Sequence, residues 1–120
     1  MYKKNQTNPF FTALLLCLVF IFAACSPSVD TSDPEKVAFA FWTAVHNQEL
    51  EAATDLIHPS QREHLSKMMQ RDFLMHTVPD LPDTLKFEMR VEGDTAVAKI
   101  LDSNGIACDL IKENGRWWVR

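Results

Sequence analysis

The spacing of apolar residues changes from helical to alternating near Leu85, and this change limits the folds that the chain can adopt. Before it, apolar side chains recur every three or four residues in the segments 34–46, 50–57 and 60–73, which predicts three helices. After it, apolar and charged residues alternate from Leu85 to Val91, which predicts a strand with one buried face. Helices followed by strands predict an α+β domain.

Capping residues give the expected limits of these helices. The first is expected to start at Ser32, which forms a capping-box pattern with Glu35, or at Asp33, which directly precedes Pro34. Asn47 is expected to cap the second helix and Pro59 to end it. The segment Ser60–Glu63, with the sequence SQRE, has the form of a capping box and is expected to start the third helix.

Turn residues divide the C-terminal part into four expected strands, at 85–91, 95–101, 106–111 and 117–120. The turns between them read EGD, DSNG and KENG, and Asn104-Gly105 is the strongest hairpin signal. Short turns join neighbouring strands only where these are antiparallel. The sequence therefore predicts a four-stranded antiparallel meander with three helices packed on it.

An apolar run from Phe10 to Ala24 precedes this domain, after the basic residues Lys3 and Lys4. As a helix, a run of this length would span about 22 Å at 1.5 Å per residue. A membrane crossing needs roughly 20 apolar residues, so the run is short for one. A basic start, a short apolar run and small residues at its end are typical of a secretory signal peptide.

The segment Phe22-Ala23-Ala24-Cys25 resembles the lipobox of bacterial lipoproteins, although Phe22 stands where leucine is usual. The resemblance implies that Cys25 carries a diacylglycerol on its sulfur and that signal peptidase II removes residues 1–24. An ordinary cleaved signal peptide and an uncleaved anchor are the alternatives. Each buried methylene contributes about 0.8 kcal/mol, so two or more acyl chains hold a protein stably on a membrane. We therefore expect Cys25 to be a membrane anchor and not a catalytic residue.

Residues 25–33 are expected to form the lipidated terminus and a flexible tether, and residues 34–120 the folded domain. Eight extended residues, SPSVDTSD, reach roughly 25 Å. In enteric bacteria, Asp directly after the lipidated Cys retains lipoproteins in the inner membrane. Ser26 therefore favours an exported protein on the periplasmic face of the outer membrane, if the cell is Gram-negative.

Charge and cysteine content exclude some classes of partner. Without Lys3 and Lys4, ten basic residues face 16 acidic ones, which argues against a nucleic-acid partner. Cys17 lies in the signal segment and Cys25 is expected to be modified, so no internal disulfide is expected. Cys108 is interpreted as a small buried apolar residue and less readily as a nucleophile.

Two longer segments resemble a known family. The sequences DPEKVAFAFWTAVHNQELEAATDLIHPSQRE and VEGDTAVAKI…DLIKENGRWWVR are similar to small lipoproteins with a nuclear transport factor two-like domain, also described as cystatin-like or of unknown function. The resemblance covers nearly the whole mature chain and contains no catalytic motif. It implies a cone, in which helices close over a curved sheet around an internal pocket, and an outer sheet face that often forms dimers.

Related folds include ketosteroid isomerase-like and dehydratase enzymes, which need an Asp or His base inside the pocket. None of the candidate residues lies in a motif that carries over from those enzymes, and structural roles explain each of them. The spacing of the histidines fits no zinc signature, and no cofactor is expected. The candidates are His46, His58, His64, Asp72 and His76, of which Asp72 or His46 would be the base.

Two groups of residues are candidates for binding. The expected pocket residues are Phe41, Trp42, Met68, Met69, Asp72, Phe73 and Phe87, for which plain core packing is the alternative. The expected interface residues are Trp118, Val97 and Ile111, for which an ordinary half-exposed strand pair is the alternative. The sequence thus predicts a non-catalytic lipoprotein that binds a partner protein or an apolar ligand. A pocket acid/base enzyme and a purely structural dimerising module are the alternative functions.

Overall fold

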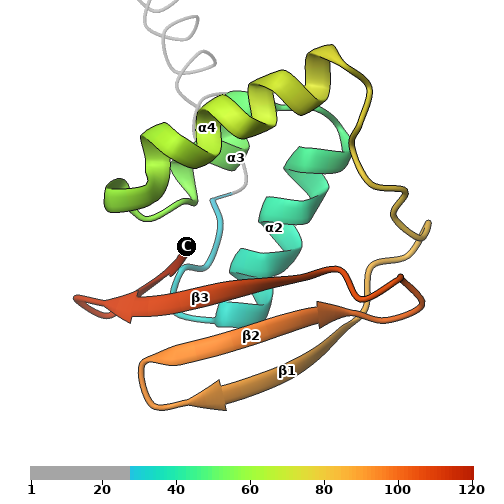
Figure 1. The fold of residues 1–120 in the computed structure, drawn as a ribbon. Helices are drawn as coiled ribbons and strands as arrows, with labels where there is room; N and C mark the ends of the chain where they lie inside the picture. The colour runs from blue at the N-terminus through green and yellow to red at the C-terminus, as the bar shows by residue number, and fades with distance from the viewer. Residues whose placement is uncertain (1–27) are drawn as a thin grey trace, which may run out of the picture.

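The computed structural model describes residues 28–120 and places helices before a four-stranded antiparallel sheet (Figure 1). The elements are α2 (Pro34–His46), α3 (Leu50–Asp55), α4 (Pro59–Leu74), β1 (Phe87–Glu92), β2 (Thr95–Ile100), β3 (Ala107–Glu113) and β4 (Arg116–Val119). The predicted α+β class and antiparallel sheet are confirmed. The predicted signal peptide, the predicted lipobox and Cys25 lie outside the described residues. No helix among residues 28–120 has the length and apolarity needed to cross a membrane.

The strands follow one another in the order β1-β2-β3-β4, so each pairs with its neighbour in the sequence. The hairpin between β3 and β4 turns at Asn114 and Gly115, which both have positive φ, 55° and 76°. This is the backbone that a two-residue type I′ turn requires. The β2–β3 connection is longer, although Asn104-Gly105 was the strongest hairpin signal. There the Ser103 hydroxyl donates to the Ile100 carbonyl at 2.7 Å and accepts from the Ile106 N–H at 3.2 Å.

The observed helix caps correct two predictions. Asp33, one of the two expected caps of α2, does accept the Glu35 N–H, at 2.9 Å. Asn47, however, ends α2, and α3 begins after Glu49 without a side-chain cap. The prediction that Asn47 caps the second helix is therefore wrong. The Asn47 N–H donates to the Thr43 carbonyl, so Asn47 serves as the C-cap of α2.

Pro59 starts α4 and does not end α3, and Ser60 lies inside the first turn of α4. His58 is the cap, since its Nδ1 accepts the Ser60 N–H at 3.1 Å. Proline is favoured at the first helical position, because the N–H that it lacks would have no partner in the helix. The capping box predicted at Ser60–Glu63 is therefore wrong, because the N-cap of α4 is His58, two residues before Ser60.

The core lies between α2 and the sheet. Its fully or nearly fully buried residues are Val37, Ala38, Phe41, Ala44 and Val45 of α2, Ala53, Leu56 and Ile57 from α3 and just after it, and Ala96, Ala98, Leu110, Trp117 and Val119 of the strands. The alanines in the middle of β2 leave room for α2 to approach the sheet. The chain after α3 also pairs with β4: the His58 N–H donates to the Val119 carbonyl at 2.7 Å, and the Val119 N–H donates to the Leu56 carbonyl at 2.8 Å.

The third helix, α4, is arranged differently from the expectation of three helices packed on the sheet. It contributes no fully buried residue, whereas α2 supplies five. Figure 1 shows α4 on the far side of the domain from β1. Its apolar stripe is therefore only half-buried, which opens a space between α4 and the rest of the domain.

The end of the expected tether lies against the domain. The Trp117 N–H donates to the Thr31 carbonyl at 2.8 Å. The Asp30 carboxylate accepts the Ser32 N–H at 3.1 Å and lies 3.6 Å from the Lys36 ammonium. Hydrogen bonds from Ser32 lower the pKa of Asp30. The chain that remains free to act as a tether is therefore shorter than residues 25–33.

Candidate functional site

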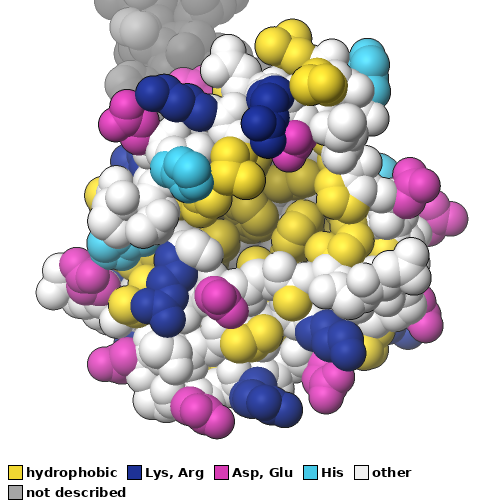
Figure 2. Space-filling view, viewed as in Figure 1, with side chains coloured by type: hydrophobic (Ala, Val, Ile, Leu, Met, Phe, Trp, Pro, Cys, Tyr) yellow, Lys and Arg dark blue, Asp and Glu magenta, His cyan; other side chains and the backbone are white. Residues whose placement is uncertain are grey.

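Apolar side chains gather in a hollow between α4 and the sheet (Figure 2). A pocket of about 170 Å³ lies in this region. It is lined by Phe41, Trp42 and Val45 of α2, by Met69, Asp72 and Phe73 of α4, and by Val78 and Pro79 of the connection to β1. We call this pocket the α2–α4 hollow. Only one of its lining residues, Asp72, carries a charge, so the site suits an apolar molecule.

The sequence produces this hollow through two helical stripes that meet incompletely. Met69 and Phe73 are four residues apart and so lie on one face of α4. Opposite them, Phe41 and Trp42 make an edge-to-face contact with ring centroids 5.3 Å apart. Met69, Phe73 and Trp42 pack against the core but stay partly exposed. An apolar wall that water still reaches is the feature that a bound apolar molecule would cover.

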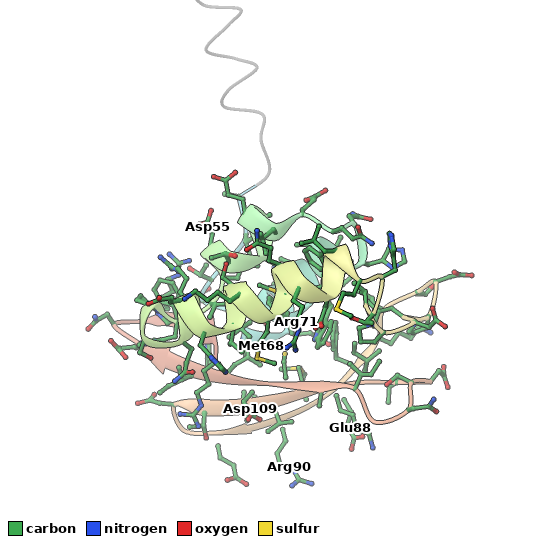
Figure 3. All side chains as sticks on the ribbon, turned by 45° about the horizontal axis from the view of Figure 1, so that its top comes forward. Asp55, Met68, Arg71, Glu88, Arg90 and Asp109 are labelled. Carbon is green, nitrogen blue, oxygen red and sulfur yellow. The ribbon has the colours of Figure 1, made fainter. Side chains whose placement is uncertain are left out.

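Five of the seven residues expected in a pocket line the α2–α4 hollow: Phe41, Trp42, Met69, Asp72 and Phe73. Met68 does not, and its side chain is 39% exposed; it is labelled in Figure 3 together with Arg71 of the same helix. Phe87 is also absent from this hollow. It lies in a separate surface depression beside Leu85 and Phe39.

The candidate bases do not converge. Asp72 lies at the hollow, where its carboxylate accepts the Thr77 hydroxyl at 3.1 Å and lies 3.9 Å from the Arg71 guanidinium. His46 is exposed and lines another depression, with Leu81 and Leu85. His64 and His76 are also exposed. These four residues therefore do not form the closed pocket with a converging base that an acid/base enzyme needs.

Cys108 packs against the core near Trp42, and its thiol is protected from ionisation. Burial raises the pKa of its thiol to about 11, the negative charge of Asp109 acts in the same direction, and Trp42 partly offsets the rise. The buried Trp42 Nε1 nevertheless meets no protein acceptor at hydrogen-bonding geometry. The N–H is thus close enough to influence the thiol without forming a regular bond to it.

Cys108 is expected to alkylate slowly in the folded chain. At pH 8 a thiol of pKa about 11 holds on the order of a hundredfold less thiolate than an ordinary cysteine of pKa about 8.5. The iodoacetamide reaction should therefore be at least about a hundredfold slower than in urea, and it should accelerate as the pH approaches 11. Equal rates in the folded and unfolded chain would contradict the buried placement of this thiol.

A second cluster joins two motifs that the sequence separates widely. His58 Nε2 lies 2.8 Å from the Glu113 carboxylate, across 55 residues of chain. The Trp118 indole lies beside His58, with ring centroids 5.9 Å apart, and the Arg116 guanidinium stacks on it at 3.8 Å from the centroid. The Arg62 guanidinium is also near this ring, at 5.9 Å. We call these five residues the Trp118 cluster.

Hydrogen bonds define the tautomer of His58 and tie the cluster to the backbone. Because the Ser60 N–H donates to Nδ1, the neutral ring carries its proton on Nε2 and donates it to Glu113. Arg62 donates to the Ile57 carbonyl at 3.2 Å, and Arg116 donates to the Asp55 carbonyl at 3.3 Å. These donors satisfy carbonyls at and just after the end of α3. The cluster therefore joins the α3–α4 junction to β4.

The Trp118 cluster was not predicted from the sequence, because its two halves are far apart in the chain. HPSQR and ENGRWW both occur in the two long segments quoted in the sequence analysis, where SQRE was interpreted only as a capping box and KENG only as a turn. The fold brings the two together: one supplies His58 and Arg62, and the other supplies Glu113, Arg116 and Trp118.

The outer face of the sheet, which points away from α2, carries the expected interface residues. Trp117 is buried against α2, so Trp118 lies on the opposite face, where Arg116 covers much of its ring. Val97 is 38% exposed and Ile111 is half-buried. Charged residues surround them, and Figure 3 shows Glu88 and Arg90 on the side of the sheet away from the helices. This face is mixed in character rather than a continuous apolar patch.

Within residues 28–120, no group of three or more His, Cys, Asp or Glu side chains is placed to hold a metal ion. No protein-family model matches this chain. Comparison with curated proteins and with solved structures likewise found no match.

Proposed function

We propose that this protein is a bacterial envelope lipoprotein whose domain binds a small apolar molecule in the α2–α4 hollow without catalysing a reaction. Lipid on Cys25 would hold it on the membrane, on the periplasmic face of the outer membrane in a Gram-negative cell. The lipobox supports the anchor. The single observation that carries the binding function is the partly exposed apolar wall of the hollow.

The cone described for cystatin-like and nuclear transport factor two-like domains is part of this proposal. Its support is the element order, in which helices precede a four-stranded meander. The position of α4, which shields the hollow without filling it, is also consistent with a cone that opens on one side. The α2–α4 hollow is lined by α2, α4 and the connection to β1, so in this cone the helices would supply most of the pocket wall.

Affinity for a neutral apolar fluorophore such as 1-aminonaphthalene tests the binding function. Phe73→Asp places a charge in the wall of the hollow, and desolvating that charge opposes binding of an apolar ligand. We expect affinity to fall about tenfold or more, which corresponds to at least about 1.4 kcal/mol. Fluorescence titration of the chain from Ser26 onward measures this.

Val97→Asp is the matched control, because it adds the same charge on the outer face of the sheet. It should leave the affinity unchanged. Circular dichroism would establish that both variants keep their fold. Equal losses in the two variants, or no saturable binding to the unsubstituted chain, would contradict the proposal.

A further inference from the structure

A second apolar surface surrounds Phe39, on the side of α2 that points away from the core. With 3.6 residues per turn, Phe39 lies almost opposite the buried Phe41. Its side chain is 50% exposed, and three adjoining surface depressions meet at it. We define the Phe39 face by six of the apolar residues that line these depressions: Phe39, Val29, Leu81, Pro82, Leu85 and Leu101. Val29 and Leu101 are also exposed, at 38% and 39%.

The start of the described chain runs along this same face. Ser28, Val29, Asp30 and Thr31 line a depression together with Phe39. The hydrogen bond from the Trp117 N–H to the Thr31 carbonyl, 2.8 Å long, holds this segment against the domain. The described chain therefore begins next to the Phe39 face.

Chain length then places this face close to the anchor. Ser28 is three residues after Cys25, and an extended chain covers at most about 3.6 Å per residue. The Cys25 backbone therefore lies within about 11 Å of the edge of the Phe39 face. The headgroup layer of a bilayer is itself several ångströms thick. A lipid on Cys25 would thus hold the edge of the Phe39 face close to the headgroup layer.

From this placement we infer that the Phe39 face rests on the lipid bilayer, with Phe39 inserted at the boundary between headgroups and acyl chains. The inference rests on the lipid anchor of the proposed function and adds a defined orientation of the domain. Attachment through the tether makes the contact intramolecular, so a small apolar face is sufficient. The occupant of this surface is the membrane itself and not a soluble ligand.

Charge indicates which lipids the face suits. Three basic and five acidic residues line the depressions that meet at Phe39, and one of each, Lys36 and Asp30, lie 3.6 Å apart. The face is therefore slightly acidic, so anionic lipids do not attract it. Apolar contact drives the docking, and zwitterionic lipids are the appropriate partner.

This orientation places the α2–α4 hollow away from the lipid surface. Phe41 and Trp42 line the hollow, whereas Phe39 lies on another side of the same helix. A ligand in the hollow and a membrane at the Phe39 face would therefore not compete for one surface.

A nitroxide at position 39 tests the orientation. The full-length chain carrying Phe39→Cys is expressed in bacteria, extracted as the processed lipoprotein, spin-labelled and placed in zwitterionic nanodiscs. Val97→Cys is the matched control on the outer face of the sheet. Because burial raises the pKa of Cys108, to about 11, this native thiol should take up little label. The chain without either substitution measures that background.

Electron paramagnetic resonance with oxygen and a nickel chelate as relaxants gives the depth of each label. We expect the label at position 39 about 5–10 Å below the headgroup surface and the label at position 97 in water. Aqueous labels at both positions in a protein that stays on the disc would overturn the orientation and leave the anchor intact. A label at position 39 shielded from both relaxants would show protein covering the face, which also overturns it. A protein that leaves the discs would overturn the anchor and the orientation together.

Discussion

Replacing Cys25 with alanine is expected to abolish incorporation of labelled palmitate into this protein. Alanine has no sulfur to form the thioether to diacylglycerol, and without that step the new amino terminus is not generated for acylation. Because each acyl methylene contributes about 0.8 kcal/mol to membrane binding, loss of the chains removes the proposed anchor entirely. The measurement is immunoprecipitation from bacteria grown with labelled palmitate.

Cys108→Ala is the control for the loss of a cysteine elsewhere in the chain. This variant should incorporate palmitate as the unsubstituted protein does, because Cys108 is partly buried in β3 and lies far from Cys25 in sequence. Palmitate retained in Cys25→Ala would contradict the lipobox interpretation.

Leu110→Ala is expected to lower the free energy of unfolding by about 2–5 kcal/mol, the range found for truncated buried leucines. Leu110 is fully buried in the middle of β3 and lies opposite Ala96 and Val119. The neighbouring Ala96 is too small to fill the space that the leucine side chain leaves, so a cavity remains. A domain of this size has a total stability of roughly 5–15 kcal/mol, so Tm should fall by about 10 °C or more.

Urea denaturation of the chain from Ser26 onward, followed by tryptophan fluorescence, measures this loss. Leu74→Ala is the matched control, because the same substitution is made where the side chain is 76% exposed. Its effect should stay within about 0.5 kcal/mol. Similar losses in the two variants would show that the core is not where the structure places it.

The sequence predicted the element types well because periodicity reports the buried face directly. In β2, Ala96, Ala98 and Ile100 are buried while Val97 between them is exposed, which is the period-2 pattern expected of a strand with one buried face. The ends of the helices were harder to predict. Pro59 is compatible with ending one helix or starting the next, and the choice depends on His58, whose ring accepts the Ser60 N–H.

The candidate site was predictable where it depends on a helical stripe and unpredictable where it depends on tertiary pairing. Met69 and Phe73 could be assigned to one face of α4 from their spacing alone. Phe87, by contrast, was expected in the same pocket, but it lies in a separate depression with Phe39 and Leu85. The contact of His58 with Glu113 depends on the chain after α3 pairing with β4, which no local pattern indicates.

Intact mass spectrometry of the protein extracted from bacterial membranes tests the central claim most directly. The account predicts a chain that begins at Cys25 and carries covalently bound acyl groups. A chain that keeps residues 1–24, or one that begins elsewhere without acyl groups, would contradict the lipid anchor and the membrane orientation that rests on it.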